Sequence, residues 1–105
     1  MAQMPAKGPA ILLYHCPEPD IIDAKYAPRI DLMVAGHIHG GQVALPLYGA
    51  LATLSRFGKQ FEQGFYADAQ GLPLYVSRGI GMEGGDMPRV RFAARPELAV
   101  IELVR

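Results

Sequence analysis

Short apolar runs separated by prolines and glycines dominate the pattern along the chain. The first run covers residues 10–15 and ends at two prolines, and the second covers residues 30–35 and ends at a glycine. Continuous apolar runs of this length between chain-breaking residues are typical of buried β-strands. We therefore expect a strand at each run. Residues 20–28 between them predict a short α-helix, capped at its start by Asp20 and ended by a proline.

The second half of the chain contains further short segments that predict strands. Residues 46–58 are apolar and interrupted by glycine, which predicts a loop or a short helix. Residues 79–88 contain four glycines in ten positions, which predicts a mobile loop. Six or seven strands with little helix indicate a sheet-dominated α/β or α+β layer structure. The remaining predicted strands are 42–45, 64–69, 72–78, 89–94 and 98–104.

Composition narrows the class of protein. The 105 residues suffice for one small domain, and half of them are apolar. Ten basic and ten acidic side chains cancel, so charge gives no case for nucleic acid as a partner. No apolar run reaches the roughly 18–20 residues of a membrane span. Residues 1–8 lack the apolar centre of a signal peptide and are expected to form an N-terminal arm.

The three histidines follow the two predicted buried strands. His15 ends the first strand, while His37 and His39 follow the second within the sequence AGHIHGGQ. The ends of neighbouring strands meet at one edge of a sheet, and alternate residues of an extended chain point the same way. The three imidazoles are therefore expected to converge on a metal ion, for which imidazole is a common ligand. The alternative is that each forms ordinary hydrogen bonds.

Three further residues are candidates around this edge, namely Gly40, Gly41 and Arg78. The N–H groups of Gly40 and Gly41 can face an anion, and Arg78 can bind a phosphate through its fork of donors. The alternative for Arg78 is a solvated side chain at the end of a strand. Cys16 follows His15, so an extended strand would direct it to the opposite face as a buried, unreactive thiol.

An apolar cluster lies beside this candidate site in the sequence, and it is expected to be core or, if exposed, to contact lipid or a lipid-like substrate. The cluster consists of Leu45, Leu47, Tyr48, Leu51, Leu54 and Phe57.

The sequence resembles one protein family at these motifs. G-H-x-H-G-G-Q after an apolar strand resembles the last metal-binding motif of the calcineurin-like metallophosphoesterases, and the upstream L-Y-H-C-P resembles their preceding histidine motif. Downstream stretches such as VALP, SRFG, GFY, YVSRG and RPEL resemble one branch of the family. The resemblance covers about residues 9–104. Its one small departure is Ile38, where threonine is more usual.

The resemblance implies the sheet-rich C-terminal half of a four-layer α/β/β/α sandwich, here residues 9–105. The family's D-x-H, G-D-x-x-D and G-N-H-[DE] motifs do not occur, and the chain contains no asparagine. The resemblance also implies that His15 and His37 bind one metal ion and that His39 binds the other. Two ions, of Mn, Zn or Fe, would be held by the intact protein. At most one is expected here, because neutral imidazoles supply no charge to offset a pair of ions.

The activity that the resemblance implies is metal-dependent hydrolysis of a phosphoester or a pyrophosphate, in a small molecule or a lipid. The chain alone is expected to be inactive and to need an N-terminal half or self-association to cover its sheet. One alternative is a non-catalytic binding or assembly module. Another is a mononuclear three-histidine zinc hydrolase, with Glu18, Asp20 and Asp23 as the nearby acids. A cytoplasmic or membrane-associated location is expected.

Overall fold

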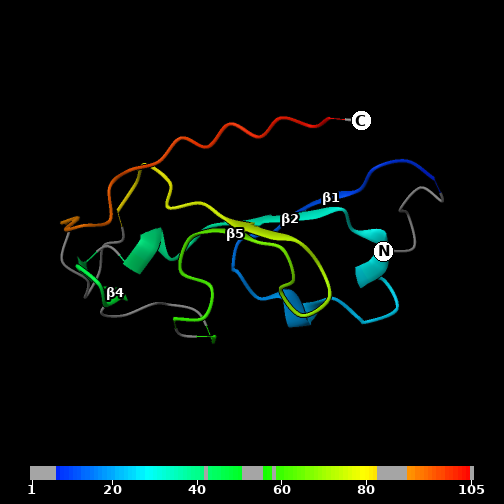
Figure 1. Ribbon diagram of the computed structural model, residues 1–105, viewed down its shortest axis with the longest axis horizontal. Helices are drawn as coiled ribbons and strands as arrows, with labels where there is room; N and C mark the ends of the chain where they lie inside the picture. The colour runs from blue at the N-terminus through cyan, green and yellow to red at the C-terminus, as the bar shows by residue number, and fades with distance from the viewer. Residues whose placement is uncertain (1–6, 42, 51–55, 58, 83–89, 105) are drawn as a thin grey trace.

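A four-stranded sheet forms the centre of the molecule (Figure 1). The computed structural model describes residues 7–41, 43–50, 56–57, 59–82 and 90–104. The strand order is β1-β2-β6-β5, in which the first three strands are parallel and β5 is antiparallel to β6. The bounds of these strands are Ile11–Leu13 for β1, Leu32–Ala35 for β2, Gly64–Tyr66 for β5 and Leu74–Val76 for β6.

A second, two-stranded sheet lies beyond one end of the first (Figure 1). It pairs β3 (Ala44–Leu45) with β4 (Gly49–Ala50) in antiparallel fashion. The N–H of Ala44 also donates to the carbonyl of Phe92 at 2.8 Å. The small sheet is therefore tied to a segment that lies much later in the sequence.

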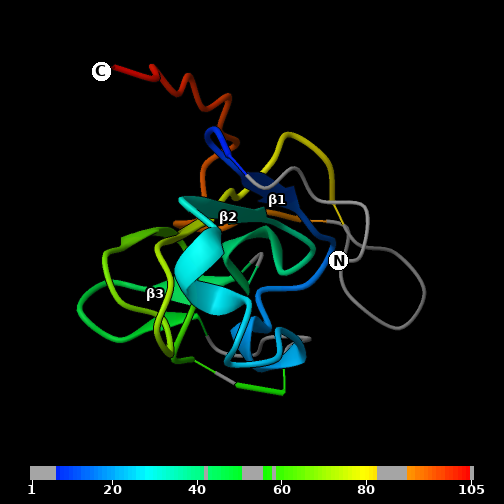
Figure 2. The same ribbon diagram turned by 90° about the vertical axis from the view of Figure 1, so that its right-hand side faces the viewer.

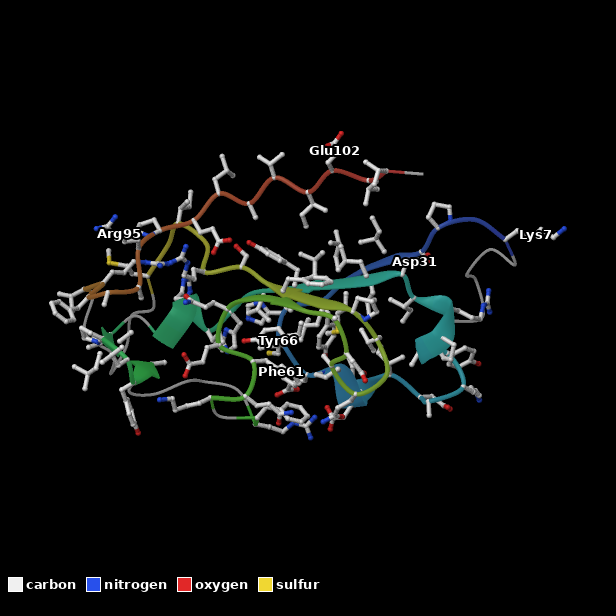
Figure 3. The ribbon with its side chains drawn as sticks, in the orientation of Figure 1. Lys7, Asp31, Phe61, Tyr66, Arg95 and Glu102 are labelled. Atoms are coloured by element: carbon white, nitrogen blue, oxygen red, sulfur yellow. The ribbon has the colours of Figure 1, made fainter. Side chains whose placement is uncertain are left out.

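The hydrophobic core lies on one face of the four-stranded sheet. Alternation within the strands directs Met33, Leu74 and Val76 to this face, and all three are fully buried. Phe61 and Tyr66 lie below the sheet in Figure 3, with ring centroids 5.1 Å apart in an edge-to-face arrangement. The other buried members of the core are Ala27, Ile30, Ala35, Ile38, Ala69 and Leu72.

The opposite face of the sheet is apolar and only partly covered. The strand register places a row of four side chains across it, one from each strand. Two of the four are strongly exposed, at 76% for Leu13 and 64% for Phe65. We call this surface the open face; its residues are Ile11, Leu13, Leu32, Val34, Phe65 and Tyr75.

The C-terminal segment, residues 95–104, runs above the open face (Figure 1) and rises away from the sheet in the view of Figure 2. A cavity of about 340 Å³ separates the segment from the sheet, lined on one side by Val34 and Tyr75 and on the other by Leu98 and Ile101. The segment therefore covers the open face without packing closely against it.

The prediction of an α-helix at residues 20–28 was wrong. The structure has two 3-10 helices instead, η1 (Pro19–Ile21) and η2 (Ala27–Arg29). The side chain of Asp23 explains the break, because its Oδ1 accepts the N–H of Lys25 at 3.0 Å. Such a local side-chain acceptor favours a turn over a continuing helix.

Most predicted strands exist but are shorter than expected. The segments at 10–15, 30–35, 42–45, 64–69 and 72–78 each contain a strand. The last two predicted strands do not form as such. Phe92 and Ala93 make only isolated bridges to Val43, and residues 98–104 have no strand assignment. Residues 92–93 lie beside Val43 and Ala44 but pair there only through isolated bridges. Residues 98–104 have no partner strand in either sheet of the described part of the chain.

Two loop predictions extend beyond the described residues. Positions 51–55 and 58 of the first loop and 83–88 of the second lie outside them, and the rest of the first loop contains β4. The parallel order β1-β2-β6 confirms the coarse α/β class. Within the described ranges, no helix is long and apolar enough to span a bilayer.

Candidate metal centre

His15 lies just beyond the carboxyl end of β1, next to the loop that follows β2. The N–H of Tyr14 donates to the carbonyl of Val34 at 3.0 Å, and the N–H of Gly36 donates to the carbonyl of His15 at 3.1 Å. These bonds continue the parallel pairing past the ends of both strands. They bring the rings of His15 and His37 together, with centroids 4.3 Å apart. The carboxyl ends of parallel strands are a common place for ligand sites.

The H-x-H loop has an unusual backbone. His37 and His39 both have positive φ angles, of 69° and 48°, and Gly40 follows with 63°. Non-glycine residues in the left-handed region are uncommon, and such strain is concentrated at functional sites. Because the loop is not extended, the alternation that predicted a common direction for the two histidines does not apply. Ile38 between them is buried in the core instead.

Cys16 joins the two histidines that the loop brings together. The ligand atoms of His15, Cys16 and His37 all lie within 4.8 Å of one another. The expectation that Cys16 points to the opposite face was wrong, because β1 ends at Leu13 and the extended geometry does not reach Cys16. Burial raises the pKa of the Cys16 thiol, and the nearby negative charge of Glu18 raises it further.

The donor set suits a divalent transition metal. Two imidazoles and a thiol are ligand types for zinc and for neighbouring first-row metals. Histidine nitrogens that bind a metal can be held in place by partners in the surrounding loop. The residues present therefore fit the metal that the histidine motifs predict.

His39 lies apart from this group and contacts Arg91. Its Nδ1 is 3.1 Å from an Nη of Arg91. A guanidinium only donates, so this contact makes Nδ1 an acceptor and assigns the ring proton of a neutral His39 to Nε2. Binding a metal through Nε2 would require the proton to move to Nδ1 and the contact with Arg91 to be lost.

Arg91 also holds the chain around residues 78–81. Its guanidinium donates to the carbonyls of Arg78 at 2.7 Å, Gly81 at 2.9 Å and Ala94 at 2.9 Å. Burial lowers the pKa of Arg91, and the positive charge of Arg78 lowers it further. This network fixes the position of His39 relative to the strand end after β6.

The candidate phosphate-binding residues Gly40 and Arg78 lie close together. A Cβ built on Gly40 would be 3.0 Å from Cγ of Arg78, so the Arg78 side chain lies directly against the glycine turn. The N–H of Gly41 donates to the carbonyl of Ile38 at 2.6 Å within this turn. Arg78 also borders a cavity of about 230 Å³, together with Gln63.

The carboxylate of Glu97 anchors the C-terminal segment beside Arg78. It accepts a hydrogen bond from the hydroxyl of Tyr75 and another from Nε of Arg78 at 2.9 Å. The bond from Tyr75 lowers the pKa of Glu97 most, partial burial opposes this, and Arg78 lowers it further. The same bond raises the pKa of Tyr75.

Replacing Glu97 by glutamine is expected to remove a pH-dependent part of the stability. Because the folded pKa lies below the ordinary value of 4.5, this contribution is fully present above about pH 4.5 and is lost as the pH falls through the folded pKa. We expect Glu97→Gln to lower the free energy of unfolding by about 1–2 kcal/mol at neutral pH. In acid the difference should shrink, which denaturant unfolding at about pH 7 and about pH 3.5 measures.

Glu102→Gln is the matched control, because Glu102 lies on the same segment and points away from the sheet (Figure 3). Its substitution should leave the pH dependence unchanged. Equal effects of the two substitutions would contradict a specific role for Glu97.

Three residues of this region were not predicted as participants in a site. Cys16 could have been found from its position next to a candidate ligand. Arg91 and Glu97 carry no such signal, because their contacts to His39 and Arg78 bridge segments far apart in the sequence.

The known proteins that are similar in sequence to this chain have names that point to one family. The chain is 38% identical over 94 residues to the uncharacterized metallophosphoesterase YkuE of Bacillus subtilis (strain 168), which covers 90% of this chain and 30% of that protein. It is 31% identical over 109 residues to the phosphodiesterase YaeI of Escherichia coli (strain K12), covering 94% of this chain and 34% of that protein.

A vertebrate protein shows the same likeness. The chain is 33% identical over 97 residues to a transmembrane protein with a metallophosphoesterase domain from Danio rerio, covering 92% of this chain and 20% of that protein. No family model and no solved structure matches the chain. It spans about a third or less of the length of these curated relatives. The chain belongs to the calcineurin-like metallophosphoesterase family and corresponds to the C-terminal part of its longer relatives.

Proposed function

We propose that this chain is the C-terminal half of a metal-dependent phosphoesterase with a dinuclear site. The observation that carries the proposal is the contact between His15 and His37 at the carboxyl end of the parallel strands. His39 lies outside that pair, which supports its assignment to a second ion. The ions would be Mn, Zn or Fe, with both held only when an N-terminal half is present.

The metal ions would supply the main chemical contribution when bound. Two divalent ions about 3.5–4 Å apart stabilise the charge on the attacking and leaving oxygens of an in-line displacement at phosphorus. The residues of this chain position that reaction. His15 and His37 would hold one side of the site, and His39 would bind the second ion in place of its contact with Arg91.

Phosphate recognition is proposed for Arg78 with Gly40 and Gly41, where the N–H of Gly41 would exchange its bond to the carbonyl of Ile38 for one to a phosphate oxygen. Arg78 lies against Gly40, and Arg78 and Gln63 both line the cavity of about 230 Å³. Glu97 accepts from Nε of Arg78, so a phosphate would share the guanidinium with this carboxylate. The substrate class is a phosphoester or pyrophosphate, in a small molecule or a lipid. A cytoplasmic or membrane-associated location remains a prediction.

The open face supports pairing with an N-terminal half. Its row of apolar side chains is the surface that a second sheet would cover in a four-layer α/β/β/α sandwich. Leu13 and Phe65 at the two sides of this row are the most exposed members. An N-terminal half that packs there would also bring the missing carboxylate ligands toward the histidines.

A non-catalytic assembly module is the second candidate, and the same open face favours it. A mononuclear three-histidine zinc hydrolase has less support, because His39 contacts Arg91 and lies outside the group of His15 and His37. Among its nearby acids, Glu18 and Asp20 both pair with Arg56.

The test compares the chain alone with a protein in which an N-terminal half carrying the D-x-H, G-D-x-x-D and G-N-H motifs precedes it. The longer protein is expected to hydrolyse a chromogenic bis-aryl phosphate when Mn is added, and the chain alone is expected to be inactive. In the longer protein, His37→Ala should lower kcat/KM by at least about 100-fold, since loss of a supporting contact alone costs roughly 10–100-fold.

Lys25→Ala serves as the control, because Lys25 is exposed and its ammonium pairs with Asp23 rather than with a candidate metal ligand. It should leave turnover unchanged. Metal-dependent turnover by the purified 105-residue chain would contradict the proposed division of the site. A longer protein that folds and binds metal but shows no turnover would favour the assembly module.

A further inference from the structure

We propose that Cys16 is a third ligand of the metal held by His15 and His37. The site would then bind a thiophilic divalent ion such as zinc through two imidazoles and one thiolate. This inference rests on the proposed function for the location of the metal, but the thiolate lies outside the ligands that the family motifs assign.

The geometry of the three side chains carries the proposal. Their ligand atoms lie within 4.8 Å of one another. Ligand atoms at bond lengths of about 2.0–2.3 Å around a tetrahedral zinc ion lie roughly 3.3–3.8 Å apart. Small side-chain rotations would close this difference, because the bond between the N–H of Gly36 and the carbonyl of His15 already holds the two loops together.

The negative charge of a thiolate would offset part of the positive charge of the metal ion, which the neutral histidines do not. Two neutral imidazoles do not offset any of the charge of a divalent ion. On binding, the Cys16 thiol releases its proton to solvent, a sulfur–metal bond replaces a bond from the metal to water, and one unit of positive charge is offset. A soft sulfur ligand also favours Zn and Co over Mg and Ca. Cys16 would thus make the site selective for Zn or Co over Mg and Ca.

Cobalt(II) absorption gives a direct test on the 105-residue chain. A cobalt–thiolate bond produces an intense charge-transfer band in the near ultraviolet, and the band can arise only from Cys16 because the chain has a single cysteine. We expect the band to grow with added cobalt and to saturate. Cys16→Ser should abolish it and weaken cobalt binding by on the order of 10-fold or more.

Two histidine variants separate ligation from mere thiol reactivity. His37→Ala should remove the band although the thiol remains, whereas His39→Ala should retain it because His39 contacts Arg91 instead. Circular dichroism of each variant checks that the fold persists. Zinc should also slow alkylation of Cys16 by iodoacetamide in the unmodified chain but not in His37→Ala.

Cobalt binding without the near-ultraviolet band would overturn the proposal, and so would a folded chain that takes up no cobalt. Neither readout depends on turnover. Absence of phosphoesterase activity in the longer protein would therefore count against the proposed function while leaving a measured thiolate bond in place.

Discussion

Leu74→Ala is expected to lower the free energy of unfolding by about 2–5 kcal/mol. Leu74 is fully buried on β6, between β2 and β5 of the sheet. The substitution deletes buried apolar atoms of the side chain. It leaves a cavity that the surrounding strands cannot fill. Because small domains have only about 5–15 kcal/mol of stability, this single change should remove a large part of it. Denaturant unfolding at fixed protein concentration measures the loss.

Leu47→Ala is the matched control, since it makes the same chemical change at a fully exposed side chain. Its effect should stay within about 0.5 kcal/mol. A comparable loss of stability in the two variants would mean that the face formed by Met33, Leu74 and Val76 is not the core of the protein.

The chain alone is expected to self-associate through the open face, and lysines at Leu13 and Phe65 are expected to abolish this association. Monomeric proteins rarely expose large continuous apolar patches. The net charge of zero provides little repulsion between copies. Sedimentation velocity at tens of micromolar should change from a dimer or larger assembly to one species of 11.4 kDa.

A second pair of lysines controls for charge. Leu47→Lys with Gln60→Lys adds the same charge at exposed positions outside the open face, and this variant should still associate. A monomeric unmodified chain with cooperative unfolding would contradict the prediction. Persistent association of the Leu13 and Phe65 variant would place the contact elsewhere. Co-expression with an N-terminal half should also replace self-association, because both would occupy the same surface.

The strands could be predicted where local pattern and tertiary pairing agree. The apolar runs that contain β1 and β2 were found because both strands are short, continuous and followed by chain-breaking residues. The helix at 20–28 failed because the pattern does not reveal that Asp23 bonds to the N–H of Lys25. The last two strands failed because alternation predicts an extended chain but does not supply a partner strand.

Part of the geometry of the candidate site could be predicted. The sequence predicted that His15 and His37 lie close together, and the parallel pairing of their strands explains why they do. The position of His39 depends on left-handed backbone angles and on Arg91. Neither can be read from residue spacing. The role of Cys16 depends on where β1 stops, which the apolar run placed two residues too late.

The register of the sheet has a consequence for the order of folding. Ile11 pairs with Leu32, whereas Met33 pairs with Leu74, a separation almost twice as long. Closing the shorter loop costs less entropy, and contacts close in sequence form faster. The β1–β2 pair can therefore form early during synthesis, with His15 and His37 already side by side. A metal ion captured at that stage would act as a folding nucleus, on which the later strand β6 then docks.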